Sequence, residues 1–376
     1  MRGNWNYPTT VRFGAGRIVE LPGLCAELGM KRPLLVTDRG LAALDITRNA
    51  AELSGAPIFS EVDGNPHAGH VEAGVEAYRE GGHDGVIAFG GGSALDVGKC
   101  VALMVGQTRP VFDFEDIGDN WTRVNVEGMA PVVAVPTTSG TGSEVGRASV
   151  IIERATHTKR LIYHPRMLPA RVLADPALTI GLPPRITGWT GIDALSHNLE
   201  AFCAPGFHPM ADGIGLEGIR LCFQHLPTAV ADGTDIDARS GMMVASTMGA
   251  TAFQKGLGAM HALAHPIGAV FNTHHGVTNG VVMPYVLRHN ESAISERLAA
   301  AARYCGLGSS FADFVDAVLS LREVCFVPNS LIDIGVPADA AAQIGPLAAL
   351  DPSAGGNPLP LDAETLTALC ETCLQS

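Results

Sequence analysis

Residues 84–99 read DGVIAFGGGSALDVGK and join three kinds of local structure. The first part, residues 84–89, is an apolar run that predicts a buried β-strand. Three glycines and Ser93 follow, and a helical pattern opens at Ala94. Glycines at such a turn let the backbone approach a ligand, and a helix N-terminus offers N–H groups to a pyrophosphate. The pattern is neither a Rossmann G-x-G-x-x-G nor a P-loop, so a tight turn without a ligand explains it equally well.

The alternation of strands and helices continues through the N-terminal half. Strands are predicted at residues 33–38, 57–62 and 131–136, and an amphipathic helix at residues 71–81. Such alternation indicates a parallel sheet. After about residue 176, helical segments rich in Ala, Leu and Met replace the strands, at residues 188–204, 212–229, 238–251 and 294–304. We therefore expect an α/β domain in residues 1–180 and an all-α domain in residues 181–376.

The composition excludes several classes of protein. The 376 residues are 47% hydrophobic and 17% charged, which favours a large core over disorder. A net charge of −13 argues against partners such as nucleic acid or anionic membranes. No apolar run approaches the roughly 20 residues of a membrane span, and residues 1–7 lack the apolar core of a signal peptide. The eight cysteines follow no disulfide spacing, so we expect a cytoplasmic, reduced protein.

Two further features follow predicted strands. Residues 137–144, TTSGTGSE, are dense in hydroxyl groups that suit a cofactor ribose or phosphate, although a polar loop with a helix cap has the same composition. Asp38 ends the first strand, where a carboxylate can bind an adenosine ribose and repel a 2′-phosphate, so NAD is favoured over NADP. A solvated loop Asp is the alternative, and the neighbouring Arg39 weakens the exclusion of NADP. Ligands of open α/β sheets bind beyond the carboxyl ends of strands.

Candidate metal ligands occur in two distant stretches. Asp193 and His197 are four residues apart, so on a helix they share one face, and His261 and His265 have the same spacing. A carboxylate with several imidazoles suits Fe(II) or Zn(II). His274 and His275 are also candidates, but adjacent extended residues point to opposite sides, and spacing alone leaves the choice open.

These motifs together resemble the iron-containing (group III) alcohol dehydrogenase family, over essentially the whole chain. The matching residues are 13–16, 65–66, 90–99, 136–144, 175–179, 191–200, 256–266 and 275–279. The resemblance implies an α/β dinucleotide-binding domain followed by a helical metal-binding and catalytic domain, a fold shared with dehydroquinate synthases. It also implies an NAD-dependent, metal-dependent alcohol dehydrogenase that acts on a small primary alcohol and its aldehyde, as a homodimer or higher homo-oligomer.

The resemblance also implies residue roles. The metal ligands would be Asp193, His197, His261 and His275, and His265 would line the site as a catalytic residue that relays a proton. The dinucleotide would be held by Asp38, Gly91, Gly92, Ser93, Asp96, Thr137, Thr138, Thr141, Lys159 and Leu178. All four ligand positions are filled, which favours a metal-dependent alcohol dehydrogenase over the glycerol dehydrogenase-like and maleylacetate reductase-like branches.

Two basic residues depart from the pattern of the family. Arg147 stands where relatives often have small or hydroxyl residues, and Lys255 lies six residues before His261. The hypothesis is that one of them binds an acidic group, so that the substrate is a short ω-hydroxy acid or its semialdehyde. Solvated cations or interface salt bridges explain both residues equally well. The remaining alternatives for the chain are a related enzyme that uses NAD without net turnover of it, and an NAD- or metal-binding protein without activity.

Overall fold

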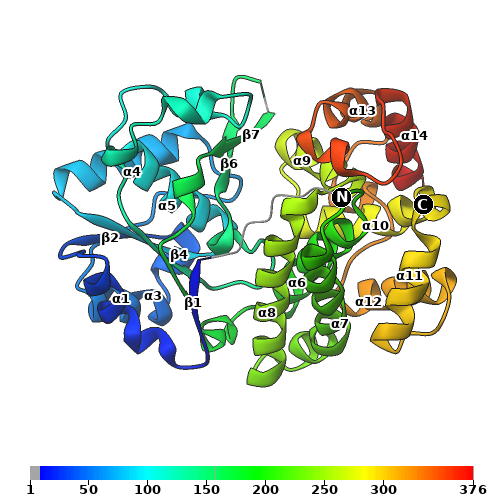
Figure 1. Cartoon of the computed structure of the whole chain (residues 1–376), viewed down its shortest axis with the longest axis horizontal. Coiled ribbons are helices and arrows are strands. Elements are labelled where there is room, and N and C mark those ends of the chain that lie inside the picture. Colours follow the sequence, from blue (N-terminus) through cyan, green and yellow to red (C-terminus); the bar gives the residue numbers. More distant parts are fainter. Residues whose placement is uncertain (1–8, 157, 376) are drawn as a thin grey trace. The chain divides into compact units, whose positions relative to one another are not determined.

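The structure is a computed structural model that describes residues 9–156 and 158–375. The expectation about a signal peptide rests on residues 1–7, which lie outside the described residues. The described chain divides into two compact units, each shown in Figure 1. Of the described residues, one unit comprises 9–138, 142–156 and 158–180, and the other comprises 139–141 and 181–375.

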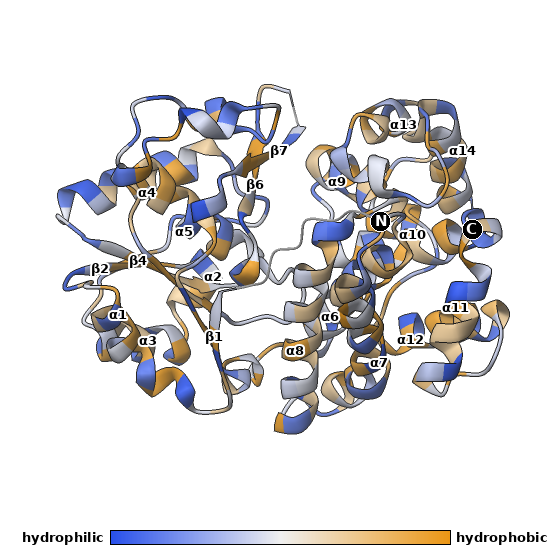
Figure 2. Ribbon diagram, viewed as in Figure 1, coloured by the Kyte–Doolittle hydropathy of each residue, from blue (hydrophilic) through white to orange (hydrophobic). Residues whose placement is uncertain are grey.

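The first unit is built on a parallel sheet, as the strand–helix alternation predicts. Its described strands are β1 (Thr10–Phe13), β2 (Pro33–Val36), β3 (Ile58–Phe59), β4 (Gly85–Gly90), β5 (Val132–Pro136) and β8 (Arg171–Ala174). Their order is β1-β8-β5-β4-β2-β3, and every neighbouring pair is parallel. β2, β4 and β5 are buried along their whole length, and the hydrophobic colour of β4 in Figure 2 reflects this. Continuous apolar runs are typical of strands covered on both faces.

Alternate residues of these strands face two layers of helices. The helices are α1 (Leu21–Glu27), α2 (Arg39–Ala42), α3 (Asp45–Ser54), α4 (Ala68–Glu80) and α5 (Gly92–Met104). Leu24 of α1 and Ala50 of α3 share a buried cluster with Ile87 and Phe89 of β4. The intervening residues Val86 and Ala88 contact α5, whose Gly98 lies directly over Ala88. Figure 1 shows α1 and α3 on one side of the sheet and α5 on the other.

An antiparallel hairpin follows β5, and sequence analysis did not find it. It consists of β6 (Ala148–Glu153) and β7 (Thr158–Tyr163). Most of its residues are only half-buried, so it lacks the apolar run that reveals the central strands. β1 was missed for the same reason, since it has no buried residue, and β8 was also not predicted although three of its four residues are buried.

The second unit is helical, as the change of composition after residue 176 predicts. Its helices are α6 (Pro184–Cys203), α7 (Pro209–Ala231), α8 (Ile236–Ala252), α9 (Ala259–Phe271), α10 (His275–His289), α11 (Glu291–Cys305), α12 (Phe311–Val324), α13 (Ala341–Ala349) and α14 (Ala363–Leu374). They surround one large apolar cluster that includes Leu195, Leu263 and Val281. No helix of the described residues is long and apolar enough to cross a membrane.

A matched pair of glycines tests the packing of α5 on the sheet. At Gly98 an added Cβ would lie 2.6 Å from the Ala88 Cβ, whereas at Gly23 of α1 it would meet no atom within 4 Å. We expect Gly98→Ala to lower the free energy of unfolding by about 1–3 kcal/mol through overpacking. Gly23→Ala should instead raise it by about 0.5–1 kcal/mol, because alanine favours the helix. Chemical denaturation measures both, and equal effects would contradict the close contact.

Candidate metal centre and nucleotide loops

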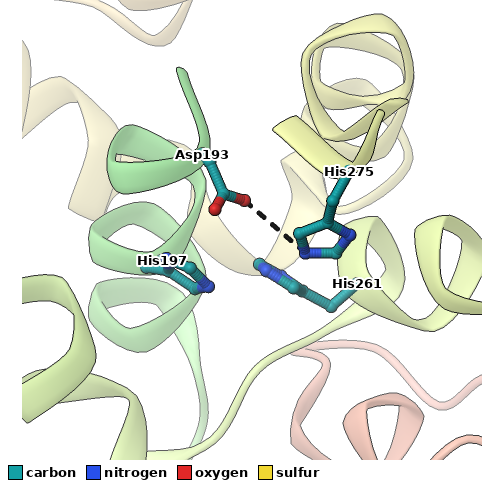
Figure 3. Close-up of side chains that lie close together, drawn as sticks. All are labelled: Asp193, His197, His261 and His275. Carbon is teal, nitrogen blue, oxygen red and sulfur yellow. Dashed lines mark ion pairs between the residues drawn. The ribbon is translucent and has the colours of Figure 1, made fainter. Parts of the chain in front are cut away.

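Four side chains of the helical unit converge on one point. Asp193 and His197 come from α6, His261 from α9 and His275 from the first turn of α10 (Figure 3). One ligand atom of each residue lies within 4.8 Å of those of the other three, so the group could hold a metal ion. Asp193, His197 and His261 are at most 5% exposed. One carboxylate and three imidazoles fit a borderline divalent ion such as Fe(II) or Zn(II).

The ends of the helices decide which histidines enter this group. His274 is the N-cap of α10 and its ring lies 5.1 Å from that of Trp189, so only His275 joins the group. His261 lies near the start of α9, whereas His265, one turn later, lies outside the group. The His265 ring is stacked on that of His275, with centroids 5.4 Å apart.

Hydrogen bonds orient the imidazoles. His197 Nδ1 lies 3.3 Å from the carbonyl oxygen of Gly140 and His261 Nδ1 lies 2.6 Å from Glu200 Oε2. Each acceptor requires the ring to donate from Nδ1, which leaves Nε2 with the lone pair that a metal needs. The Asn279 amide nitrogen donates to Asp193 Oδ1 at 2.9 Å and lies 3.3 Å from His261 Nε2. The amide therefore stands among the atoms that would bind the ion.

The electrostatics of the two buried histidines differ. Burial lowers the pKa of His197 to about 4, although Asp193 opposes the shift, so this imidazole is neutral at pH 7. Burial also disfavours the charged form of His261, but the Glu200 carboxylate outweighs it and the pKa of His261 is raised. A neutral imidazole is the form that binds a metal.

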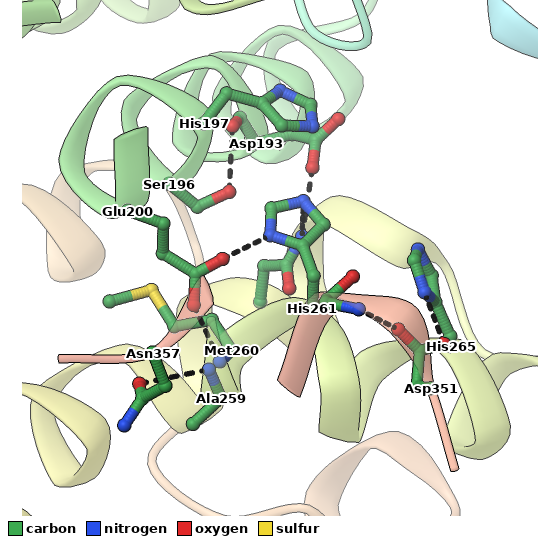
Figure 4. Close-up of polar contacts among 12 residues, drawn as sticks. Asp193, Ser196, His197, Glu200, Ala259, Met260, His261, His265, Asp351 and Asn357 are labelled. Carbon is green, nitrogen blue, oxygen red and sulfur yellow. Dashed lines mark hydrogen bonds and ion pairs between the residues drawn. The ribbon is translucent and has the colours of Figure 1, made fainter. Parts of the chain in front are cut away.

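His265 has a carboxylate partner of its own. Its Nδ1 lies 2.8 Å from Asp351 Oδ2 (Figure 4). Burial alone would raise the pKa of Asp351, but the contact with His265 and the Ser353 backbone N–H hold it below its usual value. The other oxygen of Asp351 accepts the Ser353 N–H at 2.8 Å, which caps the short 3₁₀ helix Pro352–Gly356. Asp351 was not predicted as a site residue, because it lies in a Gly- and Pro-rich loop without a motif.

Several of the predicted nucleotide residues lie at one edge of the sheet in the α/β unit. β2 and β5 both flank β4, so Asp38, the glycines after β4 and the threonines after β5 share the carboxyl edge. From β2 the chain adds β3 on one side, and from β4 it adds β5 on the other, so the order of strand addition reverses between β2 and β4. Doubly wound folds bind ligands at this point of the sheet. Gly90 has φ +144°, and a Cβ there would lie 2.7 Å from that of Ala94, so the turn requires glycine. No side chain caps the N-terminus of α5.

The contacts of the other predicted nucleotide residues vary. Asp38 Oδ1 accepts the Leu41 N–H at 2.9 Å as the N-cap of α2. Asp96 accepts hydrogen bonds from Ser143 Oγ at 2.5 Å and from the Val150 N–H at 2.9 Å, so one of its oxygens holds the loop after β5 and the other holds β6. Gly91, Thr137 and Thr138 lie in the turns described above, and Gly92 and Ser93 open α5. Lys159 lies on β7, Leu178 belongs to the apolar core, and Thr141 is part of the helical unit.

Comparison with known proteins places both units in one family. Residues 8–176 match the model described as iron-containing alcohol dehydrogenase, and residues 187–374 match its C-terminal counterpart. The chain is 39% identical to 4-hydroxybutyrate dehydrogenase of Cupriavidus necator over 346 residues, 89% of this chain and 90% of the relative. The chain belongs to the iron-containing alcohol dehydrogenase family. It is therefore an oxidoreductase that interconverts an alcohol and its aldehyde.

Solved structures of alcohol dehydrogenase relatives share the fold. A crystal structure of 1,3-propanediol oxidoreductase superposes with a TM-score of 0.93 at 32% identity and covers 100% of both chains. Sulfoacetaldehyde reductase from Bifidobacterium kashiwanohense, in complex with NAD⁺, gives a TM-score of 0.91 at 28% identity and also covers 100% of both chains. The expectation of an iron-containing alcohol dehydrogenase fold is thus confirmed.

The two basic residues singled out in this alcohol dehydrogenase have different surroundings. Lys255 is buried, with a side chain 3% exposed, and its ammonium donates to Asp212 Oδ1 at 2.5 Å and to the Phe202 carbonyl at 3.3 Å. Arg297 pairs with the same Asp212 at 2.6 Å. Arg147 is half-buried and lies 5.9 Å from the centre of the Tyr163 ring. Within the described residues, no carboxylate lies at ion-pair distance from Arg147.

The ion pair of Lys255 predicts unequal effects on stability. Asp212→Ala would leave the buried ammonium without its counter-charge, and we expect a loss of about 3–5 kcal/mol in the free energy of unfolding. Lys255→Met removes the buried cation and leaves Asp212 paired with Arg297, so its cost should be clearly smaller. The free energies of unfolding of the two variants are measured by denaturant titration and compared. A larger loss for Lys255→Met would show that the lysine is not held as described.

Proposed function

We propose that this protein is an NAD-dependent, divalent-metal-dependent dehydrogenase that interconverts a short ω-hydroxy acid and its semialdehyde. The observation that carries the proposal is the convergence of the buried Asp193, His197 and His261 with the half-buried His275 in a chain of this family. In this proposal residues 1–180 act as the dinucleotide-binding domain, and residues 181–376 act as the metal-binding and catalytic domain.

The ligand group supports the metal-dependent part of the proposal. When bound, a divalent ion supplies Lewis acidity toward an alcohol or aldehyde oxygen, and the nicotinamide supplies the hydride acceptor or donor. Asp193 and three imidazoles would hold the ion, and either iron or zinc suits this donor set. The low pKa of His197 and the hydrogen bond from His261 Nδ1 to Glu200 keep two Nε2 atoms available as ligands.

His265 is the proposed catalytic residue for proton transfer. Because Nδ1 donates to Asp351, Nε2 is left as the atom that can accept the proton released when an alcohol is oxidised. The His265 side chain is 19% exposed, in contrast to 1% for His261, so it keeps access to solvent. Asp351 holds the ring in one tautomer throughout.

The nucleotide loops support NAD as the cofactor. The N–H groups at the uncapped start of α5, with Gly91, Gly92 and Ser93, suit a pyrophosphate. One oxygen of Asp38 caps α2, and the other is left for the hydroxyl groups of the adenosine ribose. Arg39 is engaged by Asp63 at 3.0 Å, which disfavours its use for a 2′-phosphate. The remaining proposed cofactor residues are Asp96, Thr137, Thr138, Thr141, Lys159 and Leu178, and Asp96 acts by shaping the loop.

The substrate assignment rests on two relatives and one arginine. The relatives are named for 4-hydroxybutyrate and for sulfoacetaldehyde, both of which carry an acidic group at the end opposite the reacting carbon. Among the described residues no carboxylate forms an ion pair with Arg147, whereas the charge of Lys255 is matched directly by Asp212. The Asp116 carboxyl, whose pKa is raised by burial, lies near enough for Arg147 to oppose that rise. We therefore assign the acidic group of the substrate to Arg147 rather than Lys255. A guanidinium binds a carboxylate with two parallel hydrogen bonds.

The function is tested with a substrate panel on protein stripped of metal and reloaded anaerobically with Fe(II) or Zn(II). We expect NADH formation only after reloading, with 4-hydroxybutyrate preferred over 1,4-butanediol, 1,3-propanediol and ethanol. A preference for 1,3-propanediol would instead support a diol dehydrogenase, as the 1,3-propanediol oxidoreductase relative suggests. Binding of NAD without turnover on any substrate would overturn the proposal in favour of a non-redox enzyme or an inactive binding protein.

Arg147 can be tested separately. Arg147→Met should lower kcat/KM for 4-hydroxybutyrate by about tenfold or more, since a hydrogen bond to a charged group contributes about 1.5–3 kcal/mol. The value for 1,4-butanediol, which has no carboxylate, should stay near that of the unaltered protein. Lys255→Met is the matched control and should leave the ratio of the two substrates unchanged. An equal loss on both substrates in Arg147→Met would contradict the assignment.

The setting of the enzyme is also part of the proposal. All eight cysteines are free, which fits a reducing, cytoplasmic compartment. The partners proposed are a small-molecule alcohol or aldehyde and a second copy of the chain in a homodimer or higher oligomer.

A further inference from the structure

Glu200 is a buried carboxylate beside the metal-ligand group that the proposed reaction does not use directly. It lies on α6, seven residues after Asp193 and three after His197, and is 6% exposed. A buried carboxylate is costly unless both oxygens find partners. Figure 4 shows that both do, and that both partners belong to α9.

One oxygen of Glu200 caps α9. The helix follows Gly258, which offers no side chain to its first N–H groups. Glu200 Oε1 accepts the Met260 N–H at 2.7 Å, and Asn357 Oδ1 accepts the Ala259 N–H at 3.2 Å. A Cβ on Gly258 would lie 3.0 Å from Glu200 Oε1 and 2.9 Å from Asn357 Oδ1, so the missing side chain makes room for both. A negative charge at a helix N-terminus is also stabilising.

The other oxygen of Glu200 binds the ligand His261. The distance from Oε2 to Nδ1 is 2.6 Å, and the His261 side chain is 1% exposed. Since a carboxylate only accepts, Nδ1 carries the proton and Nε2 keeps its lone pair. The Asn279 amide nitrogen, 3.3 Å from Nε2, is placed to donate to that lone pair. By comparison, the partner of the outer nitrogen of His197 among the described residues is a neutral carbonyl, at 3.3 Å.

We propose that Glu200 is a positioning residue for the metal, which fixes the His261 tautomer and ring and makes Nε2 a better ligand. The proposal rests on the proposed metal-dependent function. A carboxylate on the outer nitrogen raises the basicity of a ligating imidazole, and loss of such a partner costs 10–100-fold in metal affinity in general. Together with Asp193, Glu200 also gives the site two negative charges, which match one divalent cation.

The substitution Glu200→Gln separates this role from that of a helix cap. The glutamine carbonyl can still accept the Met260 N–H, but its NH₂ group faces Nδ1 and favours the tautomer with a proton on Nε2. We expect the affinity of the apo protein for Zn(II), measured by competition with a chelating dye, to fall roughly 10–100-fold. The Tm of the apo protein should change little. Unchanged Zn(II) affinity would overturn the proposal.

Two controls decide whether Glu200 acts through His261. In a His261→Ala background, Glu200→Gln should cause no further loss of Zn(II) affinity, because the two residues act as a unit. Asp351→Asn removes the equivalent carboxylate from His265, which is outside the ligand group, and should leave Zn(II) affinity unchanged. A full additional loss in the His261→Ala background, or an equal loss in Asp351→Asn, would each overturn the proposal.

A measurement on the unaltered sequence covers the case in which Glu200→Gln does not fold. In Zn(II)-loaded protein with ¹⁵N-labelled histidine, the short contact to Glu200 predicts a strongly downfield proton resonance on Nδ1 of His261. A His261 ring with no proton on Nδ1 would overturn the proposal. None of these measurements depends on catalytic turnover. If the protein shows no dehydrogenase activity, the proposed function is refuted, but Zn(II) affinity and the NMR spectrum still decide the role of Glu200.

Discussion

The burial of three ionisable side chains around one point is the constraint on which the helical unit depends. Asp193, His197 and His261 are almost inaccessible, and polar groups buried without partners cost several kcal/mol. The partners are Glu200, Asn279 and the Gly140 carbonyl. A Cβ on Gly140 would lie 2.9 Å from Thr190, so that carbonyl reaches His197 only because the residue is glycine. The registers of α6, α9 and α10 are therefore fixed by hydrogen bonding as well as by apolar packing.

Most of the buried strands were predictable, but β8 was not, although Val172, Leu173 and Ala174 are buried, because its apolar run is short. β2, β4 and β5 carry continuous apolar runs, and their alternation with helices indicated the parallel sheet. No such signal marks the half-buried hairpin of β6 and β7 or the edge strand β1. When neither face of a strand is fully buried, apolar and polar residues need not alternate along it. The helix predicted at residues 188–204 is α6, which begins one turn earlier at Pro184, because proline is favoured at the first position of a helix.

The candidate site was predictable only as far as local spacing reaches. Asp193 with His197, and His261 with His265, have the same interval, yet only three of these residues enter the ligand group. What separates His261 from His265 is the carboxylate that each one binds, 61 and 86 residues away in the chain. Lys255 illustrates the same limit, since its partner Asp212 lies 43 residues before it. Spacing in the sequence shows which residues share one face of a helix. The roles of His261, His265 and Lys255 depend instead on a partner side chain that comes from a distant part of the chain.

The two histidines of α9 show how one helix can carry two functions. Both donate from Nδ1 to a carboxylate, so both present Nε2 as an acceptor. A metal ligand must hold a fixed geometry, and the His261 side chain is 1% exposed beneath a carboxylate that also caps its helix. A proton acceptor must exchange its proton with solvent, and the His265 side chain is 19% exposed beside a surface loop. Under the proposed roles, the same side chain and the same kind of partner give different chemistry because burial differs over a single helical turn.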